Sequence, residues 1–244
     1  MLTSVRSLTA ASLIALSAAF AAPAMAQDES SDIGISVSAN TAIVSEYRFR
    51  GVDLSGGDIA IQGGVDVALP SGFYVGTWGS SLDEDTVGYG HTELDVYGGW
   101  SGEFGNVTTD IGVIAYLYPN AGPGDFDYIE FYGSVGVAVG PASVEVGVAY
   151  APDQDSLGGG DNFYVYSDVG LGIADTPLSL TAHVGYTDGF LTFTPDGDAF
   201  DWSLGAELAI PSTPLTLGVS YVGVDGANPV FTDDAVVVSL SASF

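Results

Sequence analysis

The sequence predicts an all-β fold, an antiparallel transmembrane β-barrel of about 12 strands with short periplasmic turns and longer extracellular loops. Three observations predict it. Apolar and polar residues alternate with a period of two through most of the chain after residue 26. Charged residues make up only 14% of the chain and apolar residues 47%, whereas a soluble domain carries roughly a quarter charged residues. The connecting segments are alternately short and long.

Residues 1–26 have the features of a secretory signal peptide. Arg6 supplies a positive charge, an apolar stretch runs from Leu8 to Ala22, and Ala24-Met25-Ala26 match the small-residue cleavage pattern. The alternative is an N-terminal membrane anchor, which the short apolar stretch and the cleavage pattern disfavour. The predicted organisation is a signal peptide over residues 1–26, a short periplasmic segment over 27–36 and the barrel over 37–244.

Most of the predicted strands are about nine to eleven residues long, the length that a tilted strand needs to cross a bilayer. They cover residues 37–50, 60–69, 73–81, 91–100, 106–118, 128–138, 142–150, 162–172, 178–187, 200–210, 215–224 and 235–244. Short connectors alternate with long ones near 51–59, 82–90, 119–127, 151–161, 188–199 and 225–234. An outer-membrane barrel with both termini in the periplasm requires this sorting, and a soluble sandwich does not. We therefore expect the protein in the cell outer membrane.

Aromatic residues gather at the predicted strand ends. At the long-loop ends these are Tyr47, Phe49, Tyr118, Tyr150, Phe163, Tyr186, Trp202 and Tyr221, and at the short-turn ends Trp100 and Phe244. Rings at two levels are typical of the interfacial girdles of membrane barrels. The alternative is that they are ordinary core aromatics.

The last strand ends the chain on an aromatic residue. Apolar residues at every second position from Val236 lead to the terminal Phe244. A terminal aromatic residue on an alternating strand resembles the sorting signal read by the outer-membrane assembly machinery. That machinery is one expected partner, and outer-membrane lipid with lipopolysaccharide is the other.

Five motifs follow one another in the first half of the chain: YRFRG, SGG, AIQGG, SGFYVGTW and ELDVYGG. In this order and spacing they resemble the Gcw type of proteobacterial conserved hypothetical proteins, closely over roughly residues 38–135 and loosely over the rest. The resemblance implies a porin-like outer-membrane protein without an established activity. It therefore transfers no catalytic or binding residue.

Composition excludes several kinds of function. The chain has 3 Lys and Arg residues against 31 Asp and Glu, so it lacks the basic surface that nucleic acid requires. It has no cysteine, and its 2 histidines, His91 and His183, are far apart in sequence. We therefore expect no metal centre and no cofactor. Neither histidine stands near a serine in a hydrolase-like arrangement, so we expect no enzyme.

Strand parity predicts which charged side chains face the lumen, because a carboxylate facing lipid is costly. The candidates for a lumen lining or constriction are Glu46, Arg48, Arg50, Asp66, Glu93, Asp95, Asp110, Glu130, Glu145, Asp168, Asp201 and Glu207. His183 joins the bases if it is protonated.

Arg48 and Arg50 are the only Lys or Arg residues after residue 26, and both fall on the polar side of the first predicted strand. In one interpretation they neutralise buried carboxylates and stabilise the barrel interior. In the other they form one wall of a constriction that faces acids across the lumen and orients a solute. The two interpretations are compatible.

Acids outnumber bases in the predicted lumen, and a negatively lined pore favours cations. We therefore expect a narrow passive channel, cation-preferring, for ions or small polar solutes. The alternative is a non-conducting structural or surface-interaction barrel whose lumen is plugged by inward residues such as Tyr74, Tyr116, Tyr132, Tyr164 and Tyr166. A barrel enzyme is the third possibility.

Overall fold

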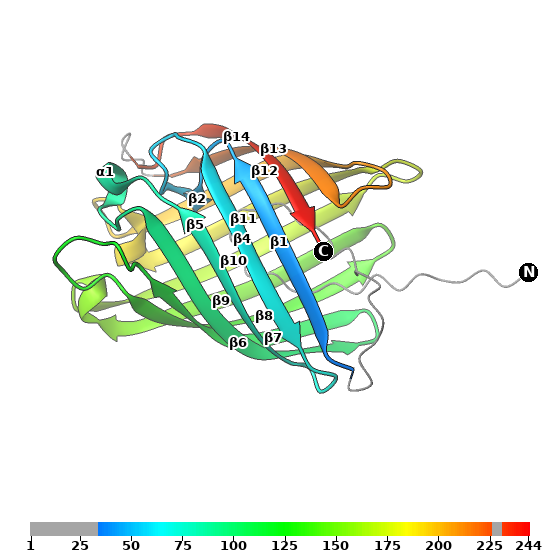
Figure 1. Ribbon diagram of the computed structural model, residues 1–244, viewed down its shortest axis with the longest axis horizontal. Helices are drawn as coiled ribbons and strands as arrows, with labels where there is room; N and C mark the ends of the chain where they lie inside the picture. The colour runs from blue at the N-terminus through cyan, green and yellow to red at the C-terminus, as the bar shows by residue number, and fades with distance from the viewer. Residues whose placement is uncertain (1–33, 226–230) are drawn as a thin grey trace, which may run out of the picture.

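A computed structural model describes residues 34–225 and 231–244. Its long strands form one closed antiparallel barrel of 12 strands, and no strand edge of this sheet is left open because β1 pairs with both β4 and β14. Figure 1 shows the barrel from the side with its strands tilted. The predicted signal peptide lies outside the described residues.

The barrel strands follow one another around the wall in chain order. They are β1 (Ser36–Val44), β4 (Ala60–Ala68), β5 (Phe73–Ser81), β6 (Thr92–Phe104), β7 (Val107–Leu117), β8 (Tyr128–Val139), β9 (Ala142–Gln154), β10 (Gly160–Gly172), β11 (Leu178–Gly189), β12 (Asp198–Ala209), β13 (Leu215–Val224) and β14 (Ala235–Ser243). The predicted strand count is confirmed. The helical elements are short: α1 (Glu84–Val87) and the single turns η1 (Asp155–Leu157) and η2 (Phe190–Thr192). None of the helices in the described ranges is both long and apolar enough to span a membrane.

The two ends of the barrel differ. Short turns lie at one end, the turn end, where β1 begins and β14 finishes; longer segments lie at the other, the loop end, together with α1 (Figure 1). At the turn end Phe244 closes the seam, because its N–H donates to Ala39 O at 2.8 Å and its O accepts from Ala39 N at 3.0 Å.

The outer face of the wall is apolar and the inner face is polar. In β8, for example, Ile129 and Phe131 are exposed, whereas Tyr128 and Glu130 are buried. The same alternation leaves a belt of Val, Leu, Ile and Phe exposed around the barrel. A surface of this kind is stable in lipid, and polar side chains then face the interior.

The first predicted strand is wrong over its last six residues. Residues 37–50 are not one strand, because β1 ends at Val44. Residues 45–59, which we call the inner hairpin, leave the wall and carry a separate two-stranded ladder of β2 (Arg48–Phe49) and β3 (Val52–Asp53). Arg48 and Arg50 therefore belong to this hairpin and not to the barrel wall.

Candidate functional site: the barrel interior

The inner hairpin lies inside the barrel at the loop end. Its apolar residues Val52 and Leu54 are 1% and 2% exposed. It contacts β8 through Glu130 and lies against β13 at Val224, and these two strands stand on opposite sides of the wall. The hairpin therefore spans the lumen, and a hydrophobic cluster that includes strand residues such as Ile114 and Tyr116 surrounds it.

Gly51 makes this position possible. Its φ of 79° lies in the left-handed region, and a β-carbon added to it would clash with the side chain of Val224. Glycine meets both demands because it has no side chain. The YRFRG motif thus ends in a glycine that lets the hairpin tip approach the opposite wall.

Arg50 makes a buried ion pair with the wall. Its Nη2 donates to Glu130 Oε2 at 2.7 Å, and both side chains are almost fully buried. The guanidinium also lies 4.2 Å from the ring centroid of Tyr164 and 4.7 Å from that of Phe49. Tyr116 donates its hydroxyl to the same Glu130 oxygen at 3.2 Å. The guanidinium of Arg50 is thus bound by the Glu130 carboxylate and lies against two aromatic rings.

Arg48 ties the hairpin to the loop before β14. Its Nη1 donates to Asp233 O at 2.8 Å and Nη2 to Asp233 Oδ1 at 3.2 Å, and it also pairs with Glu46. Burial raises the pKa of the Glu46 carboxyl above its ordinary value, outweighing the lowering by Arg48. The hairpin backbone adds a bond from Asp53 N to Phe231 O at 2.7 Å. Both arginines therefore neutralise interior acids.

Tyrosines bind the carboxylates in the part of the lumen nearer the turn end. Tyr97 donates to Asp66 at 2.6 Å, and Tyr166 donates to Glu145 at 3.2 Å. Tyr74 donates to Asp110 at 2.7 Å and its hydroxyl lies 2.5 Å from that of Tyr132. These contacts give most of the charged wall a hydrogen-bonded partner.

The same tyrosines cover glycines on neighbouring strands. Tyr97, Tyr132 and Tyr166 stand opposite Gly76, Gly112 and Gly147. A β-carbon at each glycine would meet the tyrosine ring. At these three positions the space beside the glycine is therefore filled by a tyrosine ring and is not open to water.

His183 lies between two acids. Its Nδ1 is 2.7 Å from Asp168 Oδ1 and its Nε2 is 3.0 Å from Asp201 Oδ1, with the Tyr164 hydroxyl 2.8 Å from Nε2. Both ring nitrogens of His183 therefore have polar partners on the barrel wall. His91, by contrast, is exposed and pairs with Glu84 at 2.9 Å.

Several interior carboxylate oxygens have no hydrogen-bond partner among protein atoms. Asp95 is 0% exposed, and neither of its side-chain oxygens is partnered. The same holds for Glu93 Oε2 and Glu130 Oε1, although Tyr47 donates to Glu93 Oε1 at 3.0 Å. Asp95 interacts electrostatically with both glutamates. This part of the lumen therefore holds several carboxyl oxygens that no donor of the described residues satisfies.

The structure places the predicted lumen residues on the inner face of the wall or in the inner hairpin, which carries Glu46, Arg48 and Arg50. Glu93, Asp95 and Glu130 lie near the loop end, Asp168 and Asp201 flank His183, and Asp66, Asp110, Glu145 and Glu207 lie nearer the turn end. Tyr97 and Tyr128 share the parity of these acids but were missing from the predicted tyrosine plug. Asp233, the partner of Arg48, had no signal in the sequence because it lies in a loop.

The predicted aromatic girdle at the loop end is wrong for three residues. Tyr47, Phe49 and Tyr118 are only 3%, 6% and 5% exposed and pack in the interior. Tyr150 and Tyr221 lie on the outer face as predicted. Tyr47 and Phe49 lie in the interior because they belong to the inner hairpin, which leaves the wall.

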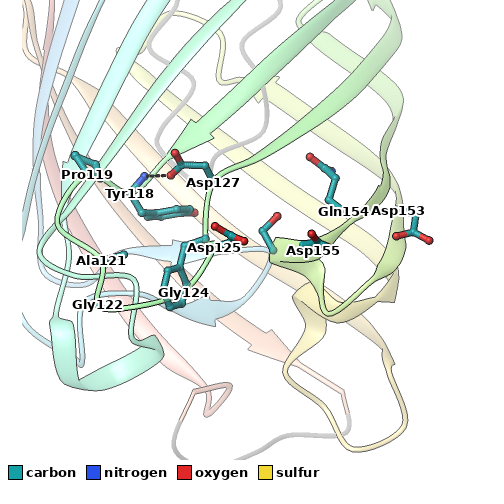
Figure 2. A pocket seen from close by; sticks show the side chains of 12 residues that line it. Tyr118, Pro119, Ala121, Gly122, Gly124, Asp125, Asp127, Asp153, Gln154 and Asp155 are labelled. Carbon is teal, nitrogen blue, oxygen red and sulfur yellow. Dashed lines mark hydrogen bonds between the residues drawn. The ribbon is translucent and has the colours of Figure 1, made fainter.

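A pocket of about 710 Å³ opens between the segment after β7 and the end of β9 (Figure 2). Asp125, Asp127, Asp153 and Asp155 contribute its acidic lining. Asp127 Oδ1 accepts a hydrogen bond from Tyr118 N at 2.7 Å, drawn dashed in Figure 2. Across the described ranges no three His, Cys, Asp or Glu side chains are grouped to hold a metal ion.

Solved structures share this fold at low sequence identity. The NanC porin is 11% identical, with a TM-score of 0.57 over 86% of this chain and 99% of that one. An outer membrane channel from Pseudomonas putida F1 is 12% identical, with a TM-score of 0.51 over 85% and 94%. These likenesses show that the chain shares the closed β-barrel fold of these proteins.

Sequence comparison identifies the family. No curated protein matches the chain. A family model described as "bacterial protein of unknown function (Gcw_chp)" matches residues 27–244. That match covers most of the chain, as the motifs in its first half indicated, so this porin-like barrel belongs to the Gcw_chp family.

Proposed function

We propose that the protein is a narrow passive channel of the outer membrane that prefers cations and passes ions or small polar solutes. The observation that carries the proposal is the charge of the wall. The inward side chains of its strands include Asp66, Glu93, Asp95, Asp110, Glu130, Glu145, Asp168, Asp201 and Glu207, and no strand of the wall carries a Lys or Arg. Such a lining attracts cations and repels anions.

The inner hairpin narrows this passage at the loop end. Among residues 34–225 and 231–244 it carries both arginines, and its apolar residues pack against the wall. Conduction therefore requires either a path beside the hairpin or its displacement. The same packing favours the second candidate, a non-conducting barrel that the hairpin plugs for good.

Planar-bilayer recording of purified protein separates the two candidates. A channel gives stepwise currents, and in a KCl gradient its reversal potential shows that K⁺ permeates better than Cl⁻. The absence of current steps supports the plugged barrel, and a preference for Cl⁻ contradicts the proposed selectivity.

A charge-removal pair tests the wall directly. Asp66→Asn with Glu145→Gln removes two half-buried lumen charges, so we expect the K⁺/Cl⁻ permeability ratio to fall about twofold or more. The matched control is Asp85→Asn on α1, where the acid is exposed. Its solvated charge is screened, so the ratio should change little. Equal effects of both changes would show that loop charge, not the wall, sets selectivity.

A further inference from the structure

The surroundings of Arg50 form a recognisable binding site for an organic cation. A carboxylate, Glu130, binds the guanidinium at 2.7 Å, and the ring of Tyr164 covers it at 4.2 Å. Paired carboxylates and aromatic faces are the groups that bind guanidinium and ammonium ions in proteins. Glu130 and Tyr164 both belong to the barrel wall, on β8 and β10.

The site offers more acceptor oxygens than Arg50 uses. Both oxygens of Asp95, together with Glu93 Oε2 and Glu130 Oε1, are buried without a partner. A buried carboxylate without a partner is costly. Arg50 engages only Glu130 among these acids. The site can therefore accept hydrogen bonds from a cation that directs more N–H donors at these oxygens than Arg50 does.

Arg50, which occupies this site, is held by fewer backbone hydrogen bonds than the wall residues that form the site. Arg50 lies in a hairpin whose own ladder has only two residue pairs, whereas Glu130 and Tyr164 lie in strands paired on both sides. Elements with few backbone hydrogen bonds open at lower free energy than a continuous sheet. The wall part of the site thus persists when the hairpin moves.

From these observations we propose that Glu130, Asp95 and Tyr164 form the solute site of the channel, that its ligand is an organic cation bearing a guanidinium group, and that Arg50 is a tethered occupant which the ligand displaces. This rests on the proposed function, and it names the class of solute. A metal ion is a poorer match, because part of the site is an aromatic face and the described side chains form no metal-holding group.

Chemical rescue tests the site. In Arg50→Ala, purified and folded in detergent, the vacated space should bind ethylguanidinium. We expect the variant to unfold at a lower temperature than the parent and ethylguanidinium to raise its midpoint saturably. The expected rise is about 3 °C at roughly ten times the dissociation constant, against equal NaCl. The parent protein should show a smaller rise, because the ligand must first displace Arg50 from Glu130.

Two double variants give the specificity control. Arg50→Ala with Glu130→Gln removes the carboxylate, and Arg50→Ala with Tyr164→Leu removes the aromatic face, so both should lose most of the rise. If Arg50→Ala does not fold, Arg50→Met keeps the stem of the side chain and takes its place. The proposal is overturned if neither single variant gains stability, or if the Glu130→Gln control gains as much.

The rescue is read from unfolding and not from current. A stabilised Arg50→Ala in a barrel that never conducts would overturn the channel and leave the cation site standing. A conducting barrel without rescue would overturn the site and leave the channel standing.

Discussion

Two buried acids in the loop-end lumen differ in what they contribute to stability. Glu130 pairs with Arg50, so Glu130→Gln leaves a buried guanidinium without its partner, and we expect a loss of about 3 kcal/mol. Asp95 has no partner and is 0% exposed. Asp95→Asn replaces a buried carboxyl that no protein donor satisfies with an amide of nearly the same shape, so stability should hold or rise.

Urea unfolding of both variants under identical conditions measures this difference. The midpoint should fall for Glu130→Gln and not for Asp95→Asn. Equal losses would mean that Asp95 is compensated by a group the protein holds in solution, such as a bound cation.

For single residues, the sequence predicted which face of the wall a side chain occupies, but it did not predict which residue the side chain contacts. Period-two parity placed Asp66 and Glu145 inward, where the structure finds them bound to Tyr97 and Tyr166. Parity states only the face of a strand. It contains no information about which residue 31 or 21 positions away will reach the carboxylate.

The inner hairpin is the element that sequence reasoning missed. After Ser45, apolar Tyr47 and Phe49 alternate with charged Glu46, Arg48 and Arg50, so the local pattern predicts a strand that continues beyond Val44. The inward turn depends instead on contacts with Glu130 and Asp233, which lie 80 and 185 positions away from their arginines. Hydrophobic periodicity cannot detect such contacts. In this segment, Gly56-Gly57 predicted only a loop.

A disulfide provides a test of whether the hairpin controls current. The chain has no cysteine, and a β-carbon built on Gly51 lies 3.4 Å from the Val224 β-carbon, near the usual range of about 3.5–4.5 Å. We expect oxidised Gly51→Cys/Val224→Cys to hold the hairpin against β13 and to suppress current steps. Reduction should restore them.

The reduced double variant is its own control, since it already includes the cost of about 1 kcal/mol for a side chain at a left-handed position. Currents that are the same before and after reduction would show that solutes pass beside a stationary hairpin, or that the hairpin is unrelated to conduction.

At the scale of the whole molecule, the barrel was predictable because one physical demand repeats in every strand. Each strand must present apolar residues to lipid and polar residues inward, and 12 repetitions make the pattern unmistakable despite the weak signal of each strand. The closure of β1 on β14 followed from the same pattern, since an open edge in lipid leaves backbone groups without hydrogen bonds.

Phe244 combines an observed backbone contact with a predicted role in assembly. Its backbone closes the seam with Ala39, and its exposed side chain is the predicted assembly signal. Phe244→Ala keeps the backbone bonds, so refolding into detergent should be nearly normal. In cells, by contrast, we expect the amount in the outer membrane to fall severalfold, as measured by membrane fractionation.

The matched control is Phe104→Ala, another exposed aromatic residue at the turn end. If both variants lose refolding yield equally, the terminal ring acts through packing and not through recognition by the assembly machinery.

The placement of both arginines in one buried hairpin also determines how the protein meets proteases. Trypsin cuts only after Lys and Arg, and beyond residue 26 the chain offers it just Arg48 and Arg50, which are 3% and 8% exposed. The folded barrel should therefore resist trypsin completely while the hairpin is seated. A single cleavage near residue 50 would record the moment at which the hairpin has left the lumen. Conversely, a tryptic digest of the unfolded chain leaves residues 51–244 as one fragment, too large for routine peptide mass spectrometry.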